Sequence, residues 1–161
     1  MSFSSQNFGA GNYKRIGKVV AICASLVVVI GIVFGFGVTA ISPNILRIYS
    51  SDPEVIDIGV LRMGYICKYY FICGVMDLMV GALRGVGYSV MPMIVSLIGA
   101  CGFRILWIYT VFSWNRTLDC LYISYPISWF LTFLVHLICY IVIYKNILKK
   151  DKFKKEISLE I

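Results

Sequence analysis

One acidic residue, Asp77, lies inside a long apolar segment that runs from about Met63 to Leu83. A carboxylate in the hydrocarbon of a bilayer costs roughly 2.5–3.5 kcal/mol on insertion scales, so such a group usually faces protein or water and marks a pathway. In a wet, partly apolar cleft a carboxylate can take up a proton or bind a cation near working pH. Asp77 is therefore a candidate to take up a proton or bind a cation. The alternative, a structural acid bonded to a neighbouring helix, stays open.

Two basic residues, Lys68 and Arg104, also lie within apolar segments. At about 1.5 Å of helix per residue, Asp77 is roughly 10 Å from the turn at Arg84, whereas Lys68 and Arg104 are roughly 20–24 Å from that side. These depths predict that Asp77 forms no ion pair with either cation. Lys68 and Arg104 could snorkel outward or line a wet outer cavity. We interpret the single histidine, His136, as a packed or hydrogen-bonded side chain in preference to a proton relay.

The composition requires a lipid environment for the elements that carry these residues. The chain has 161 residues, of which 60% are hydrophobic and only 14% are charged, and its mean hydropathy is +0.85. A soluble domain of this length cannot bury that much apolar surface in one core. The net charge of +7 does not indicate nucleic acid, because the basic residues form neither a helix stripe nor a groove interleaved with aromatic residues.

The six cysteines do not predict a metal site or a disulfide framework, because no two of them form a CxxC pair and most lie in apolar segments. We interpret them as free thiols that pack as small apolar side chains. No nucleophile with a neighbouring base is visible either. The sequence therefore predicts neither an enzyme nor a bound cofactor.

Four segments are long and apolar enough to cross a bilayer, which takes about 20 residues of helix. Backbone groups cannot stay unpaired in lipid, so these segments are predicted to be helices. We place the spans at about 18–41, 63–83, 90–112 and 120–144. Residues 1–17 would form a cytoplasmic loop and the end of a truncated helix, and residues 149–161 a basic cytoplasmic tail. The predicted fold is an all-α integral membrane protein with four transmembrane helices.

The basic residues predict the orientation of these spans, since short cytoplasmic loops carry an excess of Lys and Arg. With both termini in the cytoplasm, ten basic residues lie on that side and three lie outside. The cytoplasmic set is Lys14, Arg15, Lys18, Arg84 and the six lysines from Lys145 to Lys155, and the outer set is Arg47, Arg62 and Arg116.

Local signals predict where helices begin, end and turn. Ser51-Asp52-Pro53-Glu54 is typical of a helix start, and Ser89 could cap the third span. Arg84, Gly85 and Gly87 predict a tight cytoplasmic hairpin, in which the glycines allow the turn and Arg84 lies at the headgroups. We interpret Gly9-Ala10-Gly11 as another polar turn, because no strand and no third glycine accompany it as a nucleotide site requires.

Small residues predict close helix packing, and one proline predicts a bend. Gly31 and Gly35 are four residues apart in the first span, and Gly99 and Gly102 are three apart in the third. Such spacing lets helices approach closely in lipid. Pro126 could kink the fourth span.

Four motifs in register resemble the C-terminal lobe of the multidrug and toxic compound extrusion (MATE) transporters. The motifs are Gln6-Asn7-x-Gly9-Ala10-Gly11-x-x-x-Arg15, a long apolar helix with Ile48-Tyr49-Ser50-Ser51-Asp52-Pro53-Glu54-Val55 after it, Gly81-Ala82-Leu83-Arg84-Gly85-x-Gly87, and Met91-Pro92-Met93. The resemblance covers residues 4–148. It implies twelve helices in two six-helix lobes, of which the four spans would be the ninth to twelfth. The chain is then expected to be a fragment that lacks the N-terminal lobe.

The resemblance implies a cation-coupled antiporter in the cell membrane that exports drugs or other toxic organic compounds by alternating access. Sodium or a proton would be the coupling ion, with Asp77 as the candidate site. The expected partners are membrane lipid, an organic substrate and the missing N-terminal part of the transporter. Three alternatives stay open: a lipid-linked sugar flippase of the same superfamily, a small four-helix carrier acting as a dimer, and a non-transport membrane scaffold. The small carrier needs an acid in its first span, and residues 19–41 contain none.

Overall fold

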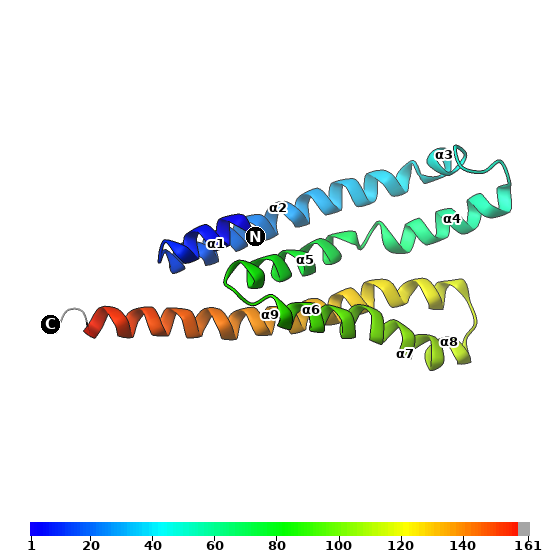
Figure 1. Ribbon diagram of the computed structural model, residues 1–161. Coiled ribbons are helices and arrows are strands. Elements are labelled where there is room, and N and C mark those ends of the chain that lie inside the picture. The colour runs from blue at the N-terminus through cyan, green and yellow to red at the C-terminus, as the bar shows by residue number, and fades with distance from the viewer. Residues whose placement is uncertain (158–161) are drawn as a thin grey trace.

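The structure is a computed structural model that describes residues 1–157, with side chains for residues 1–152. Every element in this part of the chain is a helix, and the helices run side by side in one elongated bundle (Figure 1). In chain order they are α1 (Ser2–Gly9), α2 (Tyr13–Ala40), α3 (Ser42–Leu46), α4 (Pro53–Ile66), α5 (Tyr70–Gly85), α6 (Val90–Ser96), the π-helix η1 (Leu97–Gly102), α7 (Phe103–Tyr109), α8 (Val111–Trp114) and α9 (Leu118–Ile157).

Three segments are long and apolar enough to cross a membrane: Tyr13–Ala40, Val90–Trp114 and Leu118–Lys152. The pair α4 and α5 passes the same test together, which brings the number to four if the bent pair is one span. Successive spans run in opposite directions along the bundle. The α1–α2 turn, the α5–α6 turn and the end of α9 lie at one end, and the α3–α4 and α8–α9 connections lie at the other (Figure 1).

The second span is broken, whereas the sequence predicts continuous helix through it. α4 ends at Ile66, α5 begins at Tyr70, and the two meet at an angle of 48°. At the break, the Tyr70 N–H donates to the Cys67 carbonyl three residues back, which replaces the bond of a regular helical turn. The Cys67 carbonyl lies directly against Gly35 of α2, where any Cβ would collide with it. Close contact with α2 accompanies the break, and no proline marks it in the sequence.

The fourth span also differs from the expectation, because α9 runs without interruption to Ile157. The sequence predicts a helix to about residue 144 and then a tail. Lysine favours helix, and no glycine or proline follows Tyr144, so nothing local stops the helix. Pro126 lies buried inside α9 and does not end it.

The predicted turn chemistry is present at three places. Asp52 caps α4, since its Oδ1 accepts from the Glu54 N–H at 2.9 Å. Gly11 and Gly87 have φ of 71° and 96°, and each lies just after a helix end. In both cases the N–H of the glycine and the N–H of the next residue donate to carbonyls in the last turns of the helix. This pattern is the Schellman motif, in which glycine takes the left-handed conformation. Ser89, however, makes no side-chain cap bond to α6.

The sequence predicts close helix packing at four glycines, and three of them contact a neighbouring helix. Gly31 lies against Phe71 of α5, Gly35 lies against the break, and Gly99 of η1 lies against the Thr132 side chain of α9. Gly102 meets no other helix among the described residues, because the nearest atom to the place of a Cβ is a side-chain carbon of Ile98 in η1 itself, at 3.9 Å; the expected packing role of Gly102 is not seen in this part of the chain.

The buried core lies at the end of the bundle that holds the α1–α2 turn. It joins α2, α5 and α9 through Ile16, Val20, Met79, Ala82, Leu83, Val86 and Tyr140. Elsewhere large apolar side chains are exposed, among them Val33, Phe34, Leu106 and Ile138. Such an exposed apolar surface is unusual for a protein in water and is suited to lipid or to further helices.

Candidate functional site

Asp77 lies on the exposed face of α5. The opposite face of the helix holds Met76, Met79 and Leu83, which are buried in the bundle. Arg84 lies seven residues after Asp77, so both side chains project from the same side of the helix, and the Arg84 charge acts on the carboxylate. The carboxylate makes no hydrogen bond or ion pair within the described residues. The alternative of a structural acid therefore has no bonding partner in this part of the chain.

Arg104 lies in an aromatic site made by α7 and α9. Its guanidinium carbon is 4.1 Å from the centre of the Tyr125 ring and 5.7 Å from that of Trp129. Its Nε donates to the Ser128 hydroxyl at 3.1 Å. A cation over an aromatic face gains about 0.5–2 kcal/mol, depending on how far it is desolvated. Arg104 thus packs inward against α9 and does not snorkel outward.

The aromatic site extends to α5. The rings of Tyr70 and Trp129 meet edge to face with their centres 5.8 Å apart, and Tyr125 and Trp129 do so at 6.1 Å. The Cys73 thiol, one helical turn from Asp77, is within electrostatic reach of both Asp77 and Arg104. Asp77 and Arg104 make no contact with each other among the described residues, as the sequence predicts from their different depths.

Lys68 takes no part in this arrangement. It lies in the break between α4 and α5, and its side chain is exposed. From their similar depth in the sequence, Lys68 and Arg104 are predicted to be possible lining residues of one cavity. The structure packs Arg104 of α7 against α9 instead and leaves Lys68 at the surface of the bundle.

A row of buried polar residues on α9 is a feature that the sequence analysis missed. The row recurs at every fourth residue and consists of Ser124, Ser128, Thr132, His136 and Tyr140, each less than a tenth exposed. Residues four apart share one face of a helix, so the spacing alone could have revealed the row. Three hydroxyls of the row donate hydrogen bonds to carbonyls of α9 itself: Ser124, Ser128 and Thr132. The Ser128 hydroxyl also accepts a hydrogen bond from Arg104, and His136 is hydrogen-bonded to Ser96 of α6.

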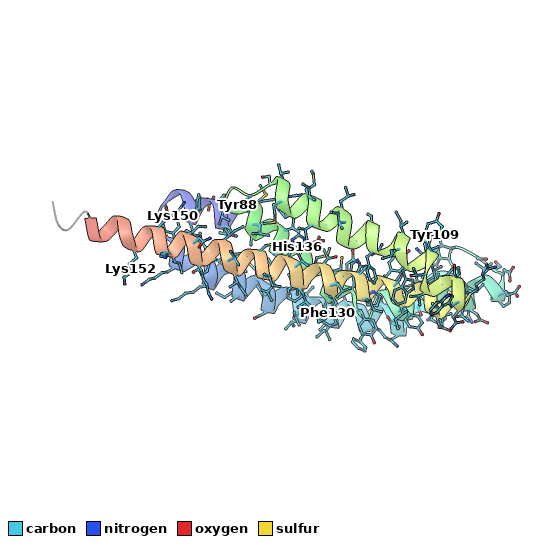
Figure 2. All side chains as sticks on the ribbon, turned by 90° about the horizontal axis from the view of Figure 1, so that it is seen from below. Tyr88, Tyr109, Phe130, His136, Lys150 and Lys152 are labelled. Carbon is cyan, nitrogen blue, oxygen red and sulfur yellow. The ribbon has the colours of Figure 1, made fainter. Side chains whose placement is uncertain are left out.

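His136 is the fourth of the five residues in this row and lies midway along the bundle (Figure 2). Its Nε2 is 3.0 Å from the Ser96 hydroxyl of α6, so the predicted hydrogen-bonded role of the histidine is confirmed. The His136 Nδ1 and the Tyr140 hydroxyl are buried and have no partner among the described residues.

The predicted hairpin residues occupy three different places. Arg84 is exposed in the last turn of α5, where a cation interacts favourably with the helix dipole. Gly85 is buried inside α5 and lies against Ser4 and Met1 of the N-terminal segment. Gly87 alone adopts the left-handed turn conformation. The two glycines therefore serve different purposes: Gly85 allows a close approach of α1, and Gly87 makes the turn.

The described residues contain no group of three His, Cys, Asp or Glu side chains that could hold a metal ion. Their six cysteines are all free thiols. What the arrangement offers is an exposed carboxylate, Asp77, on the α5 half of a candidate span, an arginine packed on aromatic rings, and a buried polar row along α9.

A bundle of long apolar helices with three to four candidate spans defines the class: a multi-pass α-helical membrane protein. The family model described as MatE matches residues 1–110, which is more than half of the chain, and the chain belongs to this family of multidrug and toxic compound transporters. The family resemblance and the all-α membrane fold expected from the sequence are confirmed.

A curated relative supports the same assignment. Over 90 residues the chain is 30% identical to the probable multidrug resistance protein NorM of Thermotoga maritima. The match covers 56% of this chain and 19% of that protein, so the matched part of the chain spans about a fifth of the length of its relative.

Proposed function

We propose that the chain forms part of a cation-coupled antiporter that exports drugs or other toxic organic compounds, and that Asp77 binds the coupling ion. The observation that carries the proposal is a carboxylate on a membrane span, exposed on its helix and without any bonding partner in the described chain. Such a group is costly in lipid and gains stability when it faces water, a proton or a cation. The family assignment makes export of an organic compound the reaction to which the ion would be coupled.

In this proposal, sodium or a proton binds Asp77 from one side of the membrane and the organic substrate leaves when the transporter changes state. The exposed face of α5 would line the path, and Arg84 at the end of the same face would keep cations from binding too tightly. Both termini would lie in the cytoplasm of a cell that carries the protein in its plasma membrane. Support for this orientation comes from the ten-to-three distribution of basic residues in the loops.

The flippase alternative receives no added support. It calls for a basic central cavity, for which Lys68 and Arg104 are the candidates. Arg104 packs on Tyr125 and Trp129, and Lys68 is exposed in the helix break.

The test is Asp77→Asn in a full-length transporter that contains this segment. Asparagine keeps the size and most hydrogen bonds of the side chain but cannot change charge, so export driven by a sodium or proton gradient should fall at least about ten-fold, equivalent to about 1.4 kcal/mol. Flux is normalised to folded protein. Asp57→Asn is the matched control, because Asp57 is also an exposed acid on a helix, in α4.

The two variants separate the functional interpretation from a structural one. A structural acid would lower the yield of folded protein and leave the transport rate per folded molecule unchanged. Wild-type flux with an unchanged cation dependence in Asp77→Asn would place the coupling site elsewhere.

A further inference from the structure

A basic cavity of about 530 Å³ opens at the end of the bundle where α2 begins. Its walls come from the α1–α2 turn, the first turns of α2 and the end of α9. The charged lining residues are Lys14, Arg15, Lys18 and Asp151. Three positive charges and one negative charge leave a net charge of +2, so the cavity suits an anion.

The cavity lies where the apolar stretch of α2 begins, which is where lipid headgroups are expected. Lys18 is the last charged residue before the apolar stretch that continues to Ala40. Cations at such a boundary mark the membrane interface. The Tyr144 hydroxyl of α9 donates to the Tyr13 carbonyl at 3.2 Å, and this bond joins the two walls of the cavity. Lys150 and Lys152 lie at the same end of the bundle and add to the positive field there (Figure 2).

An exposed apolar track continues from the cavity along the same face of α2. Ile22, Leu26, Val29 and Val33 follow Lys18 by four, eight, eleven and fifteen residues, a spacing that keeps them in line with it. Each of these four side chains is more than half exposed. A ligand that fits the cavity and the track therefore has an anionic head and apolar chains.

We propose that this site binds an anionic glycerophospholipid, with its phosphate held by Lys14, Arg15 and Lys18 and its acyl chains along α2. Arginine and lysine are the side chains that bind phosphate oxygens by charge-assisted hydrogen bonds. A zwitterionic lipid would bring its own cation against three others and should bind less well. The bound lipid would bridge α2 and α9 at the end of the bundle. This assignment is independent of the cation-coupling role of Asp77.

Native mass spectrometry of the purified 161-residue chain tests the site, with dioleoyl phosphatidylglycerol and dioleoyl phosphatidylcholine as probes. Phosphatidylglycerol should bind more tightly. A juxtamembrane Lys or Arg contributes about 1 kcal/mol, or roughly five-fold, so the triple variant Lys14→Gln/Arg15→Gln/Lys18→Gln should lose on the order of 100-fold in affinity for it. Asp151→Asn should strengthen binding, because it removes the negative charge from the wall.

The control is Arg47→Gln/Arg62→Gln/Arg116→Gln, which removes the same charge at the other end of the bundle and should keep the preference for phosphatidylglycerol. All six side chains are exposed, so neither triple variant disturbs the core; circular dichroism checks this. A triple variant of the cavity that still prefers phosphatidylglycerol would overturn the proposal. An equal loss of affinity in the control would also overturn it, as would full displacement of the lipid by inorganic phosphate, which would show a site for free phosphate.

If the cavity triple variant does not fold, the single variant Lys18→Gln decides the question. A roughly five-fold loss of affinity for phosphatidylglycerol supports the site, and no loss overturns it.

Discussion

The contact between Gly31 of α2 and Phe71 of α5 leads to the sharpest prediction about stability. A Cβ at residue 31 would lie 2.7 Å from the Cβ of Phe71 and 2.9 Å from its Cα. Carbon atoms in contact are about 3.5–4.0 Å apart, so Gly31→Ala forces a shift of roughly 1 Å. One of the two atoms belongs to the backbone, and a new rotamer of Phe71 therefore cannot relieve the collision. The helices themselves must separate.

Gly37→Ala is a matched control in the same helix, because a Cβ at residue 37 would meet no atom within 4 Å. Alanine favours helix over glycine by about 1 kcal/mol at both positions, so the difference between the variants isolates the packing effect. Overpacking of a close interface costs about 1–3 kcal/mol. Gly31→Ala should therefore have a free energy of unfolding lower than that of Gly37→Ala by that amount.

The assay is equilibrium unfolding of the purified chain by SDS added to a mild detergent, followed by near-ultraviolet circular dichroism of the aromatic side chains. The two variants and the wild type are compared at the same protein concentration. Equal unfolding midpoints for Gly31→Ala and Gly37→Ala would refute the reasoning, because they would mean that α2 and α5 do not meet at this glycine.

Two further predictions concern Arg104 and the orientation of the chain. Arg104→Lys keeps the charge but loses the planar group that lies over Tyr125, so the free energy of unfolding in the same assay should fall by about 0.5–2 kcal/mol. Arg116→Lys, in the exposed α8–α9 connection, is the control and should leave the free energy of unfolding unchanged. Equal effects of the two substitutions would argue against the aromatic site. For the orientation, alkaline phosphatase should be inactive when fused after Ile161 and active when inserted in the segment Trp114–Thr117, since the basic residues predict a cytoplasmic C-terminus. The reverse pattern of activity would contradict the proposed topology.

The sequence by itself determined the class of the protein and the places where its helices turn. Hydropathy reveals a membrane span because every residue of the span meets lipid or another helix, whatever the helix packs against. Turn chemistry is equally local: Asp52 caps α4, and Gly11 and Gly87 close the ends of α1 and α5, through bonds that reach only a few residues along the chain. Motif order was sufficient to reveal the family.

Tertiary structure decided the features that depend on which helices meet. The break of the second span lies where the Cys67 carbonyl packs against Gly35. These two residues are far apart in the sequence, so no local signal could predict their contact. Arg104 and Lys68 look equivalent by depth, yet α9 binds only Arg104, because its Tyr125, Ser128 and Trp129 face α7. The outward position of Asp77 follows in the same way: α2 and α9 cover the opposite face of α5, and the charge remains on the face that they leave exposed.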